Sequence, residues 1–280
     1  MEIFKEIAPL KAFLSEKGAT ATVGLVPTMG ALHQGHLSLI EASQQENKLT
    51  VCTIFVNPTQ FNNPQDLKKY PRTFEKDCRL LADAGCDVVF APDEKSMYES
   101  VPTIKFDFGK LDKILEGKFR PGHFSGVALV VSKLFHIVNP TIAYFGQKDF
   151  QQFKIIEKLV SELKFNLTLK RMPILREPDG LAMSSRNMRL TDADREKATV
   201  LYQSLTQAKK QLTEGEKIEK VKETVKQNFD SVPGVQLEYF ELAETENLEP
   251  ANSVTNQTVL LIAASVGEVR LIDNVLIHEN

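Results

Sequence analysis

Two histidines stand three residues apart in the segment VGLVPTMGALHQGHLSLIEAS, directly after an apolar run. The run ends at Pro27, and the pattern predicts a helix that begins around His36. Beyond the carboxyl end of a parallel strand, a helix N-terminus favours phosphate groups. If the first turn includes both His33 and His36, their imidazoles point the same way and can donate hydrogen bonds to a triphosphate or a departing pyrophosphate. Gly35 leaves the backbone open to a ligand. Such a pair can also be structural or bind a metal.

Two further clusters could contact phosphates. In FGQKD, which follows an apolar strand, Lys148 suits a phosphate oxygen. Asp149 suits either the N-terminus of the next helix or a Mg²⁺ carried by a nucleotide. The segment Met183 to Arg186 offers two hydroxyls and a guanidinium, which could clamp phosphates if its loop closes. Taken alone, each cluster is also consistent with ordinary helix capping or a serine-rich surface loop.

Neutral amides and an arginine suggest contacts to a small polar acid. Asn57 and Gln60, in FVNPTQF, follow a strand and could read hydroxyl groups. Gln151 and Gln152 open a predicted helix, so one could reach the same crevice while the other faces solvent. Arg120, in RPGHF, could meet an anion, and a loop with a capping role is the equal alternative.

The elements that must position these residues alternate along the first half of the chain. Short β-branched runs indicate strands at 21–26, 49–56, 87–90 and 141–145. Apolar residues at three- and four-residue intervals indicate helices at 72–84, 126–137 and 150–163. This alternation predicts repeated βαβ units, and therefore an α/β fold with a doubly wound parallel sheet.

The pattern changes from Thr191 onward. A capped helix is predicted to begin at Thr-Asp-Ala-Asp, a Lys/Glu-rich helical stretch to run to about Asn228, and strands to follow at 236–242 and 258–264. These features predict a smaller C-terminal α+β domain. We expect the junction near Pro173 to Leu175, with REPDGLAMSSRN as a connecting loop, and hence domains at 1–174 and 175–280.

Composition narrows the class of protein. The 280 residues carry a net charge of −3 with 42% hydrophobic and 25% charged residues, so the chain lacks the basic excess of nucleic-acid and anionic-membrane binders. We therefore expect neither nucleic acid nor membrane as a partner. Cys52, Cys78 and Cys86 form an odd set without a CxxC pair, which favours free thiols over zinc and a reducing compartment. No apolar run approaches a membrane span, so the cytoplasm is expected.

Six segments carry a family resemblance across roughly residues 20 to 190. In order, they are PTMGALHQGH, FVNPTQF, YPRTFEKD, RPGHFSGV, FGQKDFQQ and REPDGLAMSSRN. In this order and spacing the chain resembles the pantothenate synthetase family, whose superfamily of adenylate-forming nucleotidyltransferases is marked by a His-x-Gly-His signature, here HQGH. The resemblance implies a Rossmann-like N-terminal domain, a smaller C-terminal domain acting as a lid, and commonly a homodimer. The C-terminal third offers no motif to match.

The resemblance also implies roles for individual residues. Catalysis would involve His36 as proton donor, with His33, Lys148, Ser184, Ser185 and Arg186. ATP would be contacted by these residues and by Met29, Gly30, Ala31, Leu32, Gln34, Gly35, Gly146, Gln147, Asp149, Leu175 and Met183. Gln60 would meet pantoate and β-alanine, and Gln152 would meet pantoate, with Pro27, Thr28, Met29 and Asn57 beside the substrates. Position 147 is glutamine where relatives often have glutamate.

The implied reaction uses ATP and Mg²⁺ to join pantoate to β-alanine through a pantoyl adenylate, releasing pyrophosphate and AMP. Two other interpretations are compatible with the same pocket. One is a related transferase that moves a nucleotide onto a phosphorylated acceptor and stops there. The other is a nucleotide-binding protein without catalysis, which the joint presence of both histidines, Lys148 and the Met-Ser-Ser-Arg segment disfavours. An aminoacyl-tRNA synthetase would need a basic RNA-reading surface that the composition does not supply.

Overall fold

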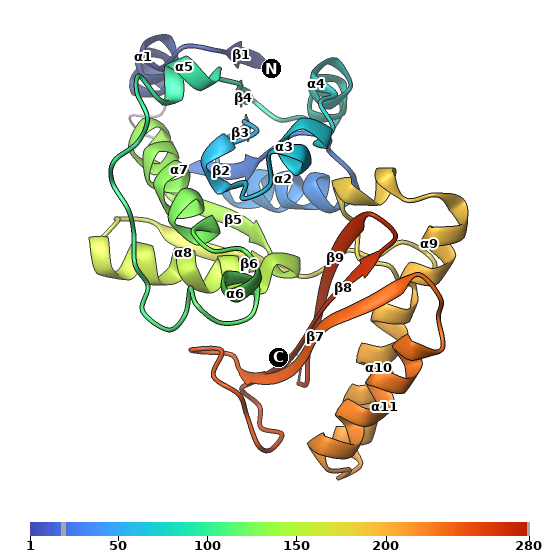
Figure 1. The fold of residues 1–280 in the computed structure, drawn as a ribbon. Helices are drawn as coiled ribbons and strands as arrows, with labels where there is room; N and C mark the ends of the chain where they lie inside the picture. Colours follow the sequence, from blue (N-terminus) through green and yellow to red (C-terminus); the bar gives the residue numbers. More distant parts are fainter. Residues whose placement is uncertain (18–20, 279–280) are drawn as a thin grey trace. The chain divides into compact units, whose positions relative to one another are not determined.

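A computed structural model describes residues 1–17 and 21–278. By its internal contacts the chain forms two compact units (Figure 1). The first unit comprises Met1–Gly146 and Gln151–Pro173; the second comprises Gln147–Phe150 and the chain from Ile174 onward. The four residues Gln147–Phe150 therefore group with the C-terminal part, although they lie between two stretches of the first unit. The predicted functional division at 174/175, with the second domain acting as a lid, stays a prediction.

The first unit is built on a six-stranded parallel sheet. Its strand order is β1-β4-β3-β2-β5-β6, with the crossovers expected of βαβ units. The strands are β1 Glu2–Phe4, β2 Val23–Thr28, β3 Leu49–Ile54, β4 Val88–Phe90, β5 Ile142–Gly146 and β6 Thr168–Met172. In the central pairs, Val26 is in register with Cys52 and Leu25 with Ala143. The predicted α/β class is confirmed.

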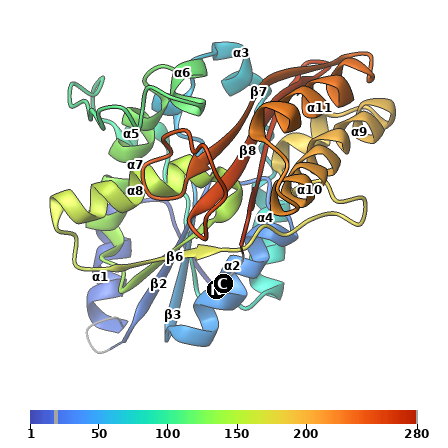
Figure 2. The ribbon, with the colours of Figure 1, turned by 90° about the horizontal axis from the view of Figure 1, so that it is seen from below.

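Helices cover both faces of this sheet (Figure 2). The helices of the first half are α1 Ile7–Lys17, α2 Gln34–Glu46, α3 Pro64–Lys69, α4 Phe74–Asp83, α5 Glu94–Met97, α6 Glu116–Phe119, α7 His123–Val138 and α8 Phe150–Leu163, with the 3₁₀ turn η1 Pro58–Gln60. From α2 and α4, Ile40 and Leu81 pack against Val26, Cys52 and Val89 of the sheet, and all five are fully buried. Burying each large apolar side chain of this kind contributes about 1.5–3 kcal/mol to the free energy of folding. The resulting core holds the strand ends in place.

The second unit contains a three-stranded antiparallel sheet, β7 Val235–Glu244, β8 Thr258–Val266 and β9 Val269–Leu276. Its helices are η2 Gln147–Asp149, η3 Ser185–Arg189, α9 Asp192–Ala198, α10 Val200–Thr213 and α11 Ile218–Asp230. Thr191 caps α9 by accepting a hydrogen bond from the Asp194 amide, as predicted. The helical stretch predicted from Thr191 to about Asn228 is found as three helices, α9, α10 and α11. One break falls where Gly215 adopts a left-handed φ of 89°, which ends α10.

The strands and helices predicted in the first half are all found, with most ends displaced by about two residues or fewer. The helix predicted at 150–163 is found as α8 with those bounds. The strands predicted at 236–242 and 258–264 are β7 and β8, each slightly longer. Strands β1, β6 and β9 were not predicted. Within the described residues no helix is both long and apolar enough to cross a membrane.

Candidate active site

The loop that follows β2 is held by a carboxylate from α4. The backbone amides of Ala31 and Leu32 donate to the two carboxylate oxygens of Asp77, at 2.9 and 2.8 Å. Gly30 and Ala31 both have left-handed φ values, 79° and 52°, which turn successive amides toward one acceptor. Asp77 is 1% exposed and also accepts from the Thr73 hydroxyl. The carboxylate therefore fixes a conformation that Ala31 would otherwise rarely adopt.

The two histidines lie at the start of α2, directly after this loop. His33 is the N-cap residue and His36 the third residue of the helix, so the helix begins two residues earlier than predicted. Their ring centroids are 4.0 Å apart with the planes inclined by 35°, so the imidazoles lie side by side as the spacing predicts. The amide of His33 donates to Nδ1 of His36 at 3.4 Å. A neutral His36 ring therefore carries its proton on Nε2, at the positive end of α2.

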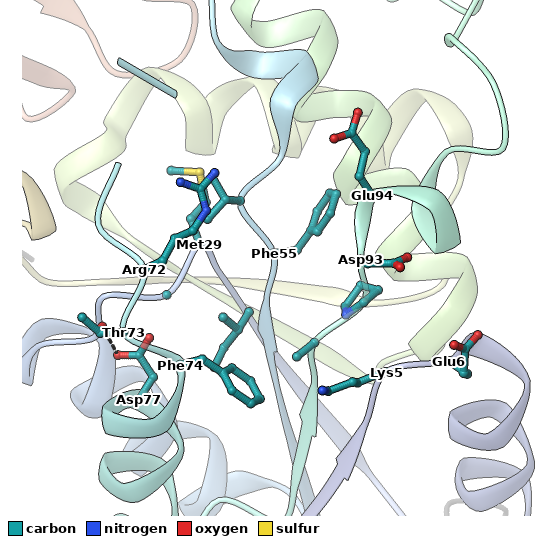
Figure 3. A pocket seen from close by; sticks show the side chains of 15 residues that line it. Lys5, Glu6, Met29, Phe55, Arg72, Thr73, Phe74, Asp77, Asp93 and Glu94 are labelled. Carbon is teal, nitrogen blue, oxygen red and sulfur yellow. Dashed lines mark hydrogen bonds between the residues drawn. The ribbon is translucent and has the colours of Figure 1, made fainter. Parts of the chain in front are cut away.

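A cavity of about 490 Å³ opens beside the same loop, at the carboxyl ends of β1, β2, β3 and β4 (Figure 3). It is lined by Lys5, Glu6, Met29, Gly30, Ile54, Phe55, Val56, Arg72, Thr73, Phe74, Asp77, Ala91, Pro92, Asp93 and Glu94. Met29 and Gly30 belong to the predicted nucleotide contacts, and the Arg72 guanidinium lies beside Met29 (Figure 3). The cavity thus joins predicted residues to Arg72 and Asp77, which sequence reasoning left without a role.

The end of β3 presents Gln60 through a network centred on Asn57. The Asn57 amide donates to Gln60 Oε1 at 3.0 Å and to the Gly126 carbonyl at 3.2 Å, while its oxygen accepts from the Tyr98 hydroxyl at 2.8 Å. Asn57 is 1% exposed, and protein groups occupy both ends of its amide. With Oε1 of Gln60 accepting from Asn57, its Nε2 is directed toward the Met29 sulfur, at 3.3 Å.

The RPGHF segment braces the Gln60 backbone. His123 Nδ1 lies 2.7 Å from the Gln60 carbonyl and its Nε2 lies 3.1 Å from Arg120 Nη1. Because guanidinium can only donate, Nε2 is the acceptor and Nδ1 carries the proton that is donated to Gln60. Arg120 also lies 4.0 Å from Glu116. These contacts hold the loop against Gln60, and the contact of Arg120 with an anion stays a prediction.

Gln151 and Gln152 follow at the start of α8. Gln151 is 3% exposed; its amide donates to the carbonyls of Leu111 and Ile114, and its oxygen accepts from the Glu116 amide. Gln152 is half-buried. Gln151 therefore supplies partners for backbone groups of the loop before α6, while Gln152 is partly accessible to solvent. The contact of one of the pair with a substrate stays a prediction.

In the second unit, η2 carries the predicted Gln147, Lys148 and Asp149 directly after Gly146. Lys148 is half-buried and Asp149 exposed. The side chain of Asn274, on β9, donates to the carbonyls of both Gln147 and Lys148, at 3.0 and 2.9 Å. The short turn that bears the lysine is therefore fixed from the C-terminal sheet.

The REPDGLAMSSRN segment forms a small hairpin rather than an irregular loop. The Met183 amide donates to the Leu175 carbonyl at 3.0 Å, which brings together two residues predicted as nucleotide contacts. Arg176 pairs with Ala182 across the hairpin and makes a bidentate ion pair with Asp273, at 2.7 and 3.1 Å. Burial raises the pKa of Asp273, and the hydrogen bonds from Arg176 oppose that rise.

The predicted Ser184, Ser185 and Arg186 lie at the start of η3. Ser184 is its N-cap, and the Ser184 hydroxyl accepts from the Arg186 amide at 3.2 Å. Ser185 is buried and Arg186 half-buried. The two serines are therefore not equivalent: one caps the turn and the other packs within it.

The predicted site residues thus fall into two groups. The first unit holds Pro27 to His36, Asn57, Gln60, Gly146 and Gln152. The second holds Gln147, Lys148, Asp149, Leu175 and Met183 to Arg186. Among the described residues, no group of three or more His, Cys, Asp or Glu side chains gathers to hold a metal ion. An exposed single carboxylate such as Asp149 fits a Mg²⁺ that arrives with a nucleotide and keeps phosphate and water ligands.

A parallel sheet with helices on both faces, whose crossover from β2 to β3 begins with an imidazole pair at a helix N-terminus, places the first unit among the α/β proteins. Comparison with known proteins gives the family. The pantoate-beta-alanine ligase family model matches residues 2–276. The chain belongs to this family of enzymes.

Relatives match over nearly the full length. Pantothenate synthetase of Cytophaga hutchinsonii is 48% identical over 265 residues, 94% of each chain, and that of Thermosipho africanus is 45% identical over 99% of this chain and 100% of its own. The crystal structure of pantothenate synthetase from Thermus thermophilus has a TM-score of 0.94 at 38% identity, covering 100% of both chains. Pantoate-beta-alanine ligase of Francisella tularensis, solved as a complex with beta-gamma ATP and beta-alanine, has a TM-score of 0.83 at 35% identity, covering 100% of this chain and 99% of its own.

Proposed function

We propose that this chain uses ATP to join (R)-pantoate to β-alanine through a pantoyl-adenylate intermediate, with release of pyrophosphate and then AMP. The observation that carries the proposal is the His33–His36 pair, with ring centroids 4.0 Å apart at the N-terminus of α2. Family membership supplies the substrates, and the relative solved with a nucleotide and β-alanine supports ATP as co-substrate.

In the first step, a pantoate carboxylate oxygen attacks the α-phosphorus of ATP and the bond to pyrophosphate breaks. Both reactants are anionic, so their approach needs cationic and dipolar compensation. His36 can supply a hydrogen bond from Nε2, because its Nδ1 accepts from the His33 amide. The positive end of α2 adds to this effect. Lys148 and Arg186 are the cations proposed for the phosphates.

In the second step, the β-alanine amine attacks the acyl carbon of the adenylate, and AMP leaves. Dividing one difficult condensation into two displacements lowers each barrier. Gln60 is the residue proposed to orient the acids, because Asn57 directs its amide nitrogen toward Met29. Gln152 is proposed as a second pantoate contact. Asn57 would then act through Gln60, since protein groups occupy its own amide.

Mg²⁺ is proposed to accompany ATP and to neutralise charge on its phosphates. Asp149 would contribute one carboxylate ligand. A cytoplasmic homodimer is a further proposal from the family resemblance, and light scattering of the purified protein would test the assembly.

Pyrophosphate exchange separates this function from its rivals. Labelled pyrophosphate should enter ATP only when pantoate is present, and AMP should appear only after β-alanine is added. Exchange driven by a phosphorylated acceptor instead of pantoate would favour the nucleotidyltransferase. Binding of ATP with no exchange under either condition would leave a nucleotide-binding protein without this reaction.

A further inference from the structure

Strand β9 carries two adjacent polar residues in an otherwise largely apolar sequence, VRLIDNVL. Asp273 is 3% exposed and Asn274 is 1% exposed. A buried polar group that lacks partners is destabilising, so both residues need hydrogen-bond partners at these positions. Their partners lie in segments that the proposed function uses.

Both polar ends of the Asn274 side chain contact η2, the turn Gln147–Asp149 that carries Lys148 and is called the lysine turn below. Its amide nitrogen donates to the carbonyls of Gln147 and Lys148, at 3.0 and 2.9 Å, and its oxygen lies 3.3 Å from Nε2 of Gln147. Both amide hydrogens are thereby used on consecutive carbonyls. The backbone of η2 therefore has a fixed position relative to β9.

The backbone amide and the backbone carbonyl of Asn274 are both hydrogen-bonded. Its amide donates to Asp273 Oδ1 at 2.8 Å, and its carbonyl accepts from Arg176 Nη2 at 3.2 Å. Arg176 forms the bidentate pair with Asp273 and lies over the Tyr202 ring, 3.9 Å from its centroid. The contact of Asn274 with the lysine turn thus depends on a guanidinium–carboxylate pair and an aromatic ring.

We propose that Asn274 is a positioning residue for Lys148: by fixing the two carbonyls around this lysine, it sets the direction in which the ammonium is presented to the nucleotide. The inference rests on the proposed function of Lys148. It gives the C-terminal strand, which carries no recognisable motif, a part in forming the nucleotide site. A purely structural role for Asn274 is the alternative.

The test compares Asn274→Ala with a matched control in the same sheet. Thr258, on β8, is 1% exposed, and its hydroxyl donates to the Thr255 carbonyl and accepts from the Thr255 amide. Thr258→Val therefore removes two hydrogen bonds that do not involve the lysine turn. Hydrogen exchange of a peptide covering residues 147–150 should be about tenfold faster in Asn274→Ala and unchanged in Thr258→Val. Equal exchange in both variants and wild type would overturn the proposal. Asn274→Ser, which keeps one donor, serves if the alanine variant does not fold.

A double-mutant cycle then asks whether the effect passes through Lys148. Misplacement of a binding group by about 1 Å can cost about 10²-fold, so kcat/KM for ATP should fall by that order in Asn274→Ala. In a Lys148→Ala background the same change should have less than about a threefold further effect, because coupled residues are not additive. Full additivity, or a kcat/KM for ATP that equals the wild-type value, would show that Asn274 is structural only.

The experiments distinguish an incorrect proposed function from an incorrect role for Asn274. If wild-type protein shows no pantoate-dependent exchange, the reaction is wrong, while the hydrogen exchange of residues 147–150 and the dissociation constant of ATP, measured by calorimetry, still test Asn274. Weaker ATP binding in Asn274→Ala, with Thr258→Val unchanged, would support positioning. Unchanged ATP binding together with unchanged hydrogen exchange would reject it.

Discussion

The carboxylate of Asp77 accepts the backbone amide of Leu32, 45 residues earlier in the chain, at 2.8 Å. This bond and its neighbour to Ala31 tie α4 to the loop that leads into the histidine pair. The geometry of His33 and His36 therefore depends on a buried acid that contacts neither ring in the described bonds. The acid acts on the loop backbone.

Asp77→Asn should weaken this arrangement. An amide retains one acceptor oxygen but turns an NH₂ group toward a backbone donor, so one charge-assisted bond is lost and one N–H is left unsatisfied. We expect about 2 kcal/mol lower unfolding free energy by urea denaturation, and about a tenfold lower kcat/KM for ATP. Thr73→Val, which removes only the hydroxyl bond to Asp77, is the control and should cost about 1 kcal/mol. Stability of Asp77→Asn within about 0.5 kcal/mol of wild type, a range typical of surface changes, would contradict this account.

Asp77 belongs to no recognised catalytic motif, but its position in the predicted helix marks it as unusual. In the predicted helix at 72–84, Asp77 stands three residues after Phe74 and four before Leu81, on the apolar side. A carboxylate on a buried helix face needs a strong partner. Sequence alone could not show that the partner would be the backbone of Ala31 and Leu32, because that pairing depends on how β2 and α4 meet in three dimensions.

The strands that sequence reasoning missed have a common physical cause. β1 and β6 are the two edges of the parallel sheet, where short or polar strands suffice because one side is not paired. β9 was missed because Asp273 and Asn274 interrupt its apolar pattern. Those two residues hold Arg176 and the Lys148 turn, so the feature that hid the strand is the one that links it to the proposed site.

Removing the proposed proton donor or the proposed phosphate cation should affect the chemical step. His36→Ala and Lys148→Ala are each expected to lower kcat by about 10²- to 10³-fold, the usual loss when one preorganised donor to a developing charge is removed. The matched controls are His136→Ala, an exposed histidine on α7, and Lys158→Ala, a lysine on α8 that is half-buried like Lys148. Both controls should stay near wild type. Turnover near wild type in a well-folded His36→Ala protein would remove His36 from the mechanism.

The close approach of α7 to η1 sets the position of Gln60. A Cβ atom at Gly126 would lie 2.3 Å from the Thr59 carbonyl oxygen and 2.8 Å from the Gln60 amide nitrogen, and both are backbone atoms. Gly126→Ala should therefore push η1 away from α7, at a cost of about 1–3 kcal/mol in unfolding free energy. Because η1 carries Gln60, the KM for pantoate should rise more than the KM for ATP.

Gly146→Ala is the stability control for Gly126→Ala. A Cβ atom there would meet nothing within 4 Å, so the protein should remain as stable as wild type. Unfolding in urea gives the stability of both variants, and initial-rate kinetics with each substrate varied in turn gives the two KM values. Equal KM changes for pantoate and ATP in Gly126→Ala would argue against a specific effect on Gln60.

The three cysteines should differ in reactivity and in their effect on stability at high pH. Burial raises the pKa of Cys86 to about 12 and also raises that of Cys52, while the half-buried Cys78 has a smaller pKa rise. Only thiolates are alkylated, so iodoacetamide at about pH 8 should label Cys78 in the native protein and all three after unfolding. Mass mapping of labelled peptides checks this. Fast native labelling of Cys86 would contradict its burial.

The same burial makes stability fall as the solution becomes alkaline. An unfolded thiol has a pKa of about 8.5, whereas the folded Cys86 has a pKa of about 12, so the unfolded state binds fewer protons between these values. Unfolding free energy should therefore be unaffected by Cys86 below about pH 8 and then decline by up to about 1.4 kcal/mol per pH unit. Urea denaturation of Cys86→Ala and of wild type should be compared from about pH 7 to about pH 10. The difference between the two gives the contribution of Cys86 ionisation to the unfolding free energy, because all other groups titrate in both proteins. The variant should lose less stability over that range; parallel curves would mean that the Cys86 thiol ionises as readily in the folded chain as in the unfolded one.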